Sequence, residues 1–252
     1  MTAPLYLLGV RVDPVSMEDA VERVRTRLRA GPPGLVVTLN ALMLGRAARD
    51  AEFRRVVNAA ALVVPDGAGT LLAARILGTR ISERVAGVDL TDRLCALCAH
   101  EGYRVFLFGA TPGVAEDAAR LLAVRHPGLV VAGTRHGYGD LDDPTVTDRI
   151  REAGPDLLVA ALGSPQQELW LDRWLVRAGA RVGIGVGGTL DVFAGRSRRA
   201  PEWMRRWGIE WLYRLLRQPR RWRQALGLPG VLGMALAERF QGRRHSPPSD
   251  GY

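Results

Sequence analysis

The chain contains no lysine, because all 35 basic side chains in its 252 residues are arginines. A GC-rich genome produces such a composition, and arginine also suits phosphate groups, which it binds through two parallel hydrogen bonds. The sequence has neither a GxSxG motif nor a P-loop. Their absence excludes the common acyl-transfer and ATP-hydrolysis sites.

Long apolar runs are also missing. No stretch reaches the roughly 20 residues that a membrane-spanning helix needs, and the first residues, MTAPLYLLGVRVD, lack the charged start and cleavage site of a signal peptide. We therefore expect a protein that stays in the cytoplasm.

Cysteine is scarce, and the two present, Cys95 and Cys98, form a CxxC inside the helix-like stretch TDRLCALCAHEG. Without a second pair of ligands this pattern indicates two small apolar residues on one helix face rather than a zinc or redox site. The histidines show no metal-ligand spacing either, so we predict no metal site; they are His100, His126, His136 and His245.

Charge is distributed unevenly. Residues 196 to 252 hold thirteen Arg and four acidic residues, which is the whole net charge of +9, whereas residues 1 to 195 hold 22 of each sign. Four of the six Trp lie in the same basic stretch. Such a surface fits an anionic and partly apolar partner: a phosphate-rich polymer, a membrane face or a phosphorylated lipid.

Short apolar runs alternate with segments of helical period, which predicts βαβ units. The runs are nearly continuous in Val, Leu and Ala, as in strands that helices cover on both faces of a parallel sheet. We predict an α/β, Rossmann-like domain over residues 1 to 195, with strands at 35 to 39, 61 to 65, 103 to 109, 128 to 133, 155 to 162 and 180 to 187.

The texture changes after Gly195. Residues 196 to 244 predict a small helical appendage, basic and rich in Trp, whose apolar end ALGLPGVLGMALAERF suits a membrane surface. Its apolar residues could equally serve contacts between subunits, and so a homo-oligomer. Residues 245 to 252 predict a disordered tail.

Ligands of open parallel sheets bind beyond the carboxyl ends of the strands. Five strand ends carry polar or glycine residues: Thr38 and Asn40, Asp66 and Gly67, Gly109 to Thr111, Gly163 to Gln167, and Gly187 to Thr189. We expect a site at this edge.

Asp66 is the one carboxylate among these strand-end residues, and it follows Pro65 in a turn. It is either a general base toward a hydroxyl or the N-cap of a helix over GAGTLLAARIL. Thr38 and Asn40 have the same two interpretations, ligand binding or capping of the next helix.

Two further patterns are weaker. Gly183, Gly185 and Gly188 match GxGxxG, but inside a strand and without an acidic residue at a suitable distance, so they do not predict a dinucleotide site. They still leave room for a phosphate or sugar near the backbone. Asp140 and Asp142 form a lone DxD, which indicates a solvated turn more than a cation site.

In combination, the strand ends resemble the WecG/TagA/CpsF family, glycosyltransferase family 26, over about residues 5 to 224. The resemblance rests on TLNALM (38 to 43), VVPDGAG (63 to 69), ERVAGVDL (83 to 90), FLFGA (106 to 110), GSPQQE (163 to 168), GVGGTLDVFAG (185 to 195) and RAPEWMRRWGIEWLYRLLRQPRR (199 to 221).

This resemblance implies an inverting transferase that needs no metal or other cofactor. Its substrates would be a UDP-sugar, most often of the N-acetylmannosamine type, and a sugar linked to polyprenyl diphosphate at the inner face of the cytoplasmic membrane. The product would serve a cell-surface polysaccharide or teichoic acid.

The same resemblance implies roles for individual residues. Asp66 matches the catalytic base, and the substrate-binding positions are Thr38, Asn40, Arg84, Gly109, Gln167, Gly188, Arg214 and Arg221. The last two arginines lie in the appendage, which is thought to close over the site and place Arg against the UDP diphosphate. Two other classes compete with this interpretation: a membrane-associated scaffold without catalysis, and a nucleic-acid-binding protein.

Overall fold

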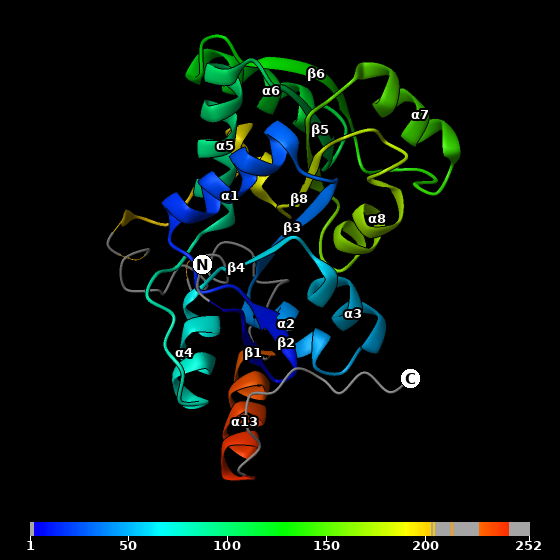
Figure 1. The fold of residues 1–252 in the computed structure, drawn as a ribbon. Helices are drawn as coiled ribbons and strands as arrows, with labels where there is room; N and C mark the ends of the chain where they lie inside the picture. The colour runs from blue at the N-terminus through cyan, green and yellow to red at the C-terminus, as the bar shows by residue number, and fades with distance from the viewer. Residues whose placement is uncertain (1–2, 203, 205–212, 214–226, 242–252) are drawn as a thin grey trace.

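The fold is built on a six-stranded parallel sheet (Figure 1). The computed structural model describes residues 3–202, 204, 213 and 227–241. The strands run in the order β4-β3-β8-β7-β5-β6. Their bounds are β3 (Gly34–Leu39), β4 (Leu62–Pro65), β5 (Arg104–Gly109), β6 (Val130–Arg135), β7 (Leu157–Ala161) and β8 (Val182–Gly185). All five strand pairings are parallel, so the predicted α/β, Rossmann-like fold is confirmed.

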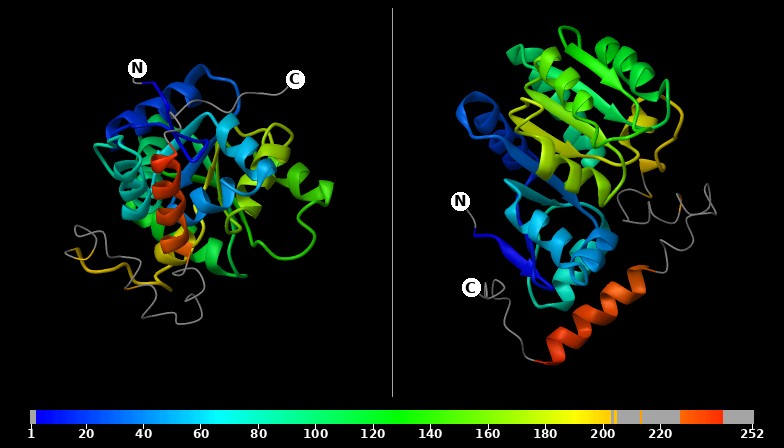
Figure 2. Two further views of the ribbon diagram at one scale, coloured as in Figure 1. Left: turned by 90° about the horizontal axis from the view of Figure 1, so that it is seen from below. Right: turned by 90° about the vertical axis from the view of Figure 1, so that its right-hand side faces the viewer.

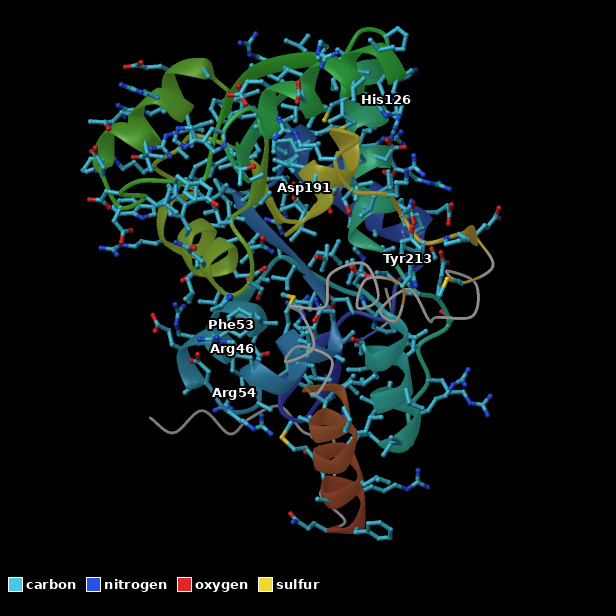
Figure 3. The ribbon with its side chains drawn as sticks, turned by 180° about the vertical axis from the view of Figure 1, so that it is seen from behind. Arg46, Phe53, Arg54, His126, Asp191 and Tyr213 are labelled. Atoms are coloured by element: carbon cyan, nitrogen blue, oxygen red, sulfur yellow. The ribbon has the colours of Figure 1, made fainter. Side chains whose placement is uncertain are left out.

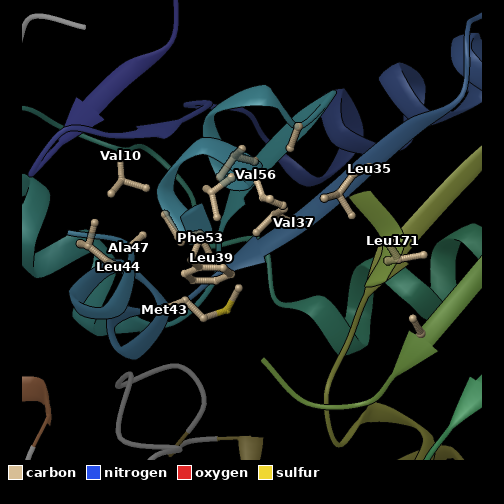
Figure 4. Close-up of a cluster of buried hydrophobic side chains, with 14 of the residues drawn as sticks. Val10, Leu35, Val37, Leu39, Met43, Leu44, Ala47, Phe53, Val56 and Leu171 are labelled. Carbon is tan, nitrogen blue, oxygen red and sulfur yellow. The ribbon is translucent and has the colours of Figure 1, made fainter. Parts of the chain in front are cut away.

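Helices cover both faces of the sheet. On one face pack α1 (Met17–Ala30), α5 (Gly87–Glu101), α6 (Val114–Arg125) and α9 (Thr189–Phe193), and on the other α3 (Ala51–Ala59), α7 (Pro144–Ala153) and α8 (Gln166–Trp174). Successive strand side chains point to opposite faces. In β3, Leu35 and Val37 therefore join the cluster around Phe53 of α3, as Figure 4 shows, while Val36 joins the opposite cluster.

Three helices stand at the carboxyl end of β3 and β4: α2 (Ala41–Ala47), α4 (Ala68–Ile76) and α13 (Gly227–Phe240). In Figure 2 α13 crosses this end of the molecule as a separate rod. Two glycines let it approach closely: a Cβ at Gly45 would collide with Val231, and one at Gly69 would lie 2.7 Å from Leu228 Cδ1. The docking position of α13 therefore depends on Gly45 and Gly69, which have no side chains.

A short antiparallel hairpin, β1 (Leu5–Leu7) and β2 (Val10–Val12), precedes the sheet, and the sequence analysis did not anticipate it. Asp13 follows the hairpin, and its backbone N–H donates to the carbonyl of Val63. The buried Asp13 carboxylate accepts a 2.8 Å hydrogen bond from the N–H of Val63. These contacts occupy part of the outer edge of β4, which would otherwise offer free backbone groups.

The division of the C-terminal part into an appendage (196–244) and a disordered tail (245–252) stays a prediction, because most of it lies outside the described residues. The predicted ligands Arg214 and Arg221 fall there too. Among the helices that the structure describes, none is long and apolar enough to cross a membrane.

Candidate active site at the carboxyl edge of the sheet

The strand order brings the predicted residues together along one edge. β4, β3 and β8 are neighbours, so Asp66, Thr38 and the loop after Gly185 lie side by side at their carboxyl ends. β7 and β5 are adjacent strands. After β5 the chain continues to β6 on one side, and after β7 it continues to β8 on the other side. Such a divergence between adjacent strands marks the crevice where open α/β sheets bind ligands.

Asp66 does not cap α4, so the capping interpretation is wrong for this residue. The N-cap is Gly67, which lies at φ 86°, where glycine is favoured. The Asp66 carboxylate instead turns toward α5, and its Oδ2 accepts a 3.2 Å hydrogen bond from the N–H of Gly87, the first residue of that helix. The hydrogen bond and the partial positive charge of a helix N-terminus both favour a negative charge here.

Thr38 lies directly beside this hydrogen bond. Its hydroxyl donates to the carbonyl oxygen of Gly185 at 3.0 Å and caps no helix. A Cβ on Gly87 would lie 3.1 Å from Thr38 Cγ2, so the start of α5 packs tightly on the threonine. Thr38 thereby helps to position the Gly87 N–H that binds Asp66.

Asn40 is the N-cap of α2, which confirms its capping interpretation. Its side-chain oxygen accepts hydrogen bonds from the N–H groups of Leu42 and Met43 at 3.0 and 3.1 Å. The side-chain amide donors remain for other partners, and a ligand role for Asn40 stays a prediction.

Gln167 connects two loops of the edge. It is 2% exposed, and its Oε1 accepts hydrogen bonds from the N–H of Gly163, after β7, and of Gly187, after β8, at 3.2 and 2.9 Å. Its Nε2 donates to Glu168 at 2.6 Å. The contact of Gln167 with a substrate stays a prediction.

The glycines of this edge have separate structural reasons. Gly109 lies at φ 123°, and a side chain there would collide with the backbone of Ala161. Gly183 lets α8 pack on β8, because its Cβ would meet Leu171 and Leu175. Gly188 precedes α9, close to the Asp191 carboxylate. The GxGxxG match is thus explained by the packing of helices against β8.

Two carboxylates at this edge escaped the sequence analysis. Glu168, in the first turn of α8, is fully buried, and Asp191 lies on α9 near the centre of the molecule in Figure 3. Each lies in the first turn of a helix, Glu168 seven residues after the end of β7 and Asp191 six residues after the end of β8. A carboxylate in the first turn of the helix after a strand is thus the sequence signal for such residues.

The start of the basic C-terminal stretch is anchored at the same edge. Arg199 forms a two-pronged pair with Asp89, the third residue of α5, and Arg196 pairs with Asp117 of α6 at 2.8 Å. The helical turn that binds Asp66 therefore also holds Arg199. Arg84 lies three residues before the start of this helix, and its predicted ligand role stays a prediction.

The weaker patterns have structural roles. In the DxD turn, Asp142 accepts a 3.0 Å hydrogen bond from Trp174 Nε1, and its own N–H donates to Asp140. Cys95 and Cys98 are buried in α5, and burial raises the pKa of Cys95 to about 12, so these thiols behave as small apolar residues. Over the described ranges, no group of three His, Cys, Asp or Glu side chains suits a metal ion.

Comparison with known proteins shows the family of the chain. Residues 5–245 match the model of the family described as "Glycosyl transferase WecG/TagA/CpsF family". Among similar curated proteins, the N-acetylglucosaminyldiphosphoundecaprenol N-acetyl-beta-D-mannosaminyltransferase of Bacillus subtilis (strain 168) is 33% identical over 81% of this chain and 79% of its own. The protein of the same name from Staphylococcus aureus (strain MRSA252) is 36% identical over 85% of each chain.

Proposed function

The chain belongs to the WecG/TagA/CpsF family of glycosyl transferases, and on that premise we propose that it transfers an N-acetylmannosamine-type sugar from a UDP-sugar to a polyprenyl-diphosphate-linked N-acetylglucosamine. The names of its relatives give the sugar and the acceptor. The observation that supports the site is the Asp66 carboxylate, held by Gly87 at the carboxyl edge of the sheet.

In this proposal Asp66 is the general base. Direct displacement at the anomeric carbon requires a group that takes the proton of the acceptor hydroxyl as the new bond forms. A carboxylate held by the backbone N–H of Gly87, a residue that packs closely on Thr38, suits that role. Because the sugar is displaced from the opposite side, its configuration inverts.

The leaving UDP gains negative charge, and we propose that arginines rather than a metal ion balance it. Arg196 and Arg199 hold the start of the basic stretch against α6 and α5, and Asp89, the partner of Arg199, lies in the helical turn whose Gly87 binds Asp66. Guanidinium groups bind diphosphate oxygens in pairs and stabilise developing charge at a site shielded from water. The further arginines of this stretch, Arg214 and Arg221 among them, are the proposed diphosphate ligands.

We also propose that the protein works on the cytoplasmic face of the cell membrane. The helix α13 faces outward with an uncharged side made of Pro229, Gly230, Gly233, Leu236, Ala237 and Phe240, all of them exposed. An apolar outer side is unusual for a surface helix and typical of one that lies in a lipid interface. Arg49 and Arg239 flank it and suit anionic headgroups.

Replacement of Asp66 by Asn tests the proposed function. We expect the full chain to release UDP from UDP-N-acetylmannosamine when a polyprenyl-diphosphate-N-acetylglucosamine is supplied, and the Asp66→Asn variant to lose about 100-fold or more in kcat, because general-base catalysis contributes 10²–10⁴-fold. Asp172→Asn is the control, since Asp172 lies in a surface ion pair with Arg55.

Undiminished turnover in Asp66→Asn would remove Asp66 as the base. Absence of UDP release from the unmodified chain with every UDP-sugar and this acceptor would contradict the transferase proposal itself and favour a scaffold without catalysis.

A further inference from the structure

Glu168 is a buried acid that the proposed mechanism does not use. It is fully shielded from solvent, and one carboxyl oxygen, Oε2, has no hydrogen-bond partner among the described residues. Burial raises the pKa of Glu168, although hydrogen bonds from Gln167 and Ser164 act in the opposite direction. A buried carboxyl group costs folding free energy, so its presence calls for a compensating role.

Helix capping does not supply that role. A glutamate at the third position of a helix commonly accepts a hydrogen bond from the backbone N–H of the N-cap residue. The N-cap of α8 is Pro165, which has no N–H to donate. The Glu168 side chain instead points inward, toward β8.

The partner of Glu168 is the amide of Gln167. Oε1 of Glu168 accepts the 2.6 Å hydrogen bond from Gln167 Nε2. This contact fixes which end of the amide is nitrogen, and so directs the amide oxygen at the N–H groups of Gly163 and Gly187. Without an acceptor at Glu168, the amide could rotate and release both loops.

Gly185 gives this pair its place in the sheet. A Cβ there would lie 2.7 Å from both Gln167 Nε2 and Glu168 Oε1, so only glycine admits the pair against β8. The carbonyl of Gly185 in turn accepts the hydrogen bond of Thr38, which packs beside Asp66. A chain of contacts thus connects Glu168 with the strand that carries Thr38.

We propose that Glu168 is a positioning residue of the transfer site, whose carboxyl oxygen fixes the Gln167 amide and thereby holds the Gly163 and Gly187 loops in the geometry that receives the donor nucleotide. The inference rests on the proposed function, because it takes a UDP-sugar as the ligand of this edge. Glu168 itself contacts no substrate in this arrangement.

Two substitutions separate its hydrogen bond from its shape. Glu168→Gln retains a carbonyl acceptor of the same size, whereas Glu168→Met has a similar length and no acceptor. Glu152, an exposed residue of α7, takes the same two substitutions as a control. In the full chain, UDP affinity is measured by calorimetry, and hydrogen exchange of the Gly163 and Gly187 amides is measured by NMR.

We expect Glu168→Met to bind UDP about tenfold more weakly, which corresponds to about 1.4 kcal/mol. The variant should also lose protection from hydrogen exchange at both amides. Glu168→Gln should restore both within about twofold. If Met leaves protection and affinity intact, or if Gln fails as completely as Met, the proposal is overturned. The exchange measurement needs no ligand, so a chain that binds no UDP would contradict the proposed function and leave the role of Glu168 in the loops testable.

Discussion

At the scale of single residues, the Asp66 carboxylate binds a distant part of the chain. It accepts a hydrogen bond from Gly87, twenty-one residues further on, although the helix that follows at once is nearer in sequence. Strand periodicity predicts which residues end a strand, but it does not tell which distant helix begins beside them. Glu168 escaped for the opposite reason, because it lies inside a helix and looks like an ordinary solvated glutamate.

The raised pKa of Glu168 predicts how stability depends on pH. Below about 4.5, the ordinary value, the carboxyl group is protonated in both the folded and the unfolded chain. Above it the unfolded chain ionises while the folded chain keeps its proton, so the free energy of unfolding falls by up to about 1.4 kcal/mol per pH unit until the folded pKa is reached.

Glu168→Gln cannot titrate, so its stability relative to the unmodified chain should rise as the pH increases above about 4.5. Urea unfolding at several pH values measures this difference. Glu152→Gln, at an exposed position of α7, is the control. A difference for Glu168→Gln that does not change with pH would contradict the prediction.

The proposed charge balance predicts the response to metal removal. If arginines stabilise the leaving UDP, UDP release after treatment with EDTA should stay within about twofold of the untreated rate, since no interaction in the transition state is lost. Added Mg²⁺ should likewise change the rate little. A loss of activity that Mg²⁺ restores would contradict this part of the proposal.

At the scale of elements, all six predicted sheet strands are present, because continuous Val, Leu and Ala runs identify strands covered on both faces. The hairpin of β1 and β2 was not predicted. Each of its strands has three residues, too few for a period of two to be distinguished. The seat of α13 was also beyond prediction, since a lone glycine in a helix gives no sign of what packs on it.

Two glycine substitutions test that seat and should act in opposite directions. Gly45→Ala places a methyl group against Val231 and should destabilise the docking of α13 by about 1–3 kcal/mol, the usual cost of overpacking. Gly233 lies on α13 itself and faces open space. Gly233→Ala should therefore stabilise α13 by roughly 0.5–1 kcal/mol.

The extent of α13 docking can be followed by trypsin cleavage after Arg239, whose guanidinium donates to the carbonyl of Ile76 in α4. Faster cleavage is expected for Gly45→Ala and slower cleavage for Gly233→Ala. Equal rates in the two variants would show that the glycine at 45 does not set the position of the helix.

At the scale of the whole molecule, charge and apolar surface are concentrated toward the C-terminus. The sequence placed a membrane-binding region there from composition alone, and the structure adds the outer face of α13 at the same end as α2 and α4. Composition could not show which side of the helix faces outward, because apolar residues occur on every side of it.

Charges on that outer face should weaken membrane binding. Phe240 is 86% exposed and Leu236 45%, and burial of such side chains contributes about 1.5–3 kcal/mol each. The double variant Leu236→Asp, Phe240→Asp should float at least tenfold less with liposomes of anionic lipid than the unmodified chain. Turnover of a water-soluble, short-chain acceptor should be retained.

Val124→Asp is the matched control for flotation, because Val124 is 75% exposed but lies on α6. Flotation equal to that of the unmodified chain in the double variant would exclude α13 as a membrane contact. It would leave its apolar face for contact with a second copy, which sedimentation measures.

The two hydrogen bonds between Asp13 and Val63 have a consequence for synthesis on the ribosome. The two residues are separated by 50 positions, and a chain grows at about 5–20 residues per second. For about 3 to 10 seconds the Asp13 carboxylate therefore stays hydrated, because β4, which carries its partner Val63, has not yet been made. The hairpin of β1 and β2 is therefore made before the strand that it contacts.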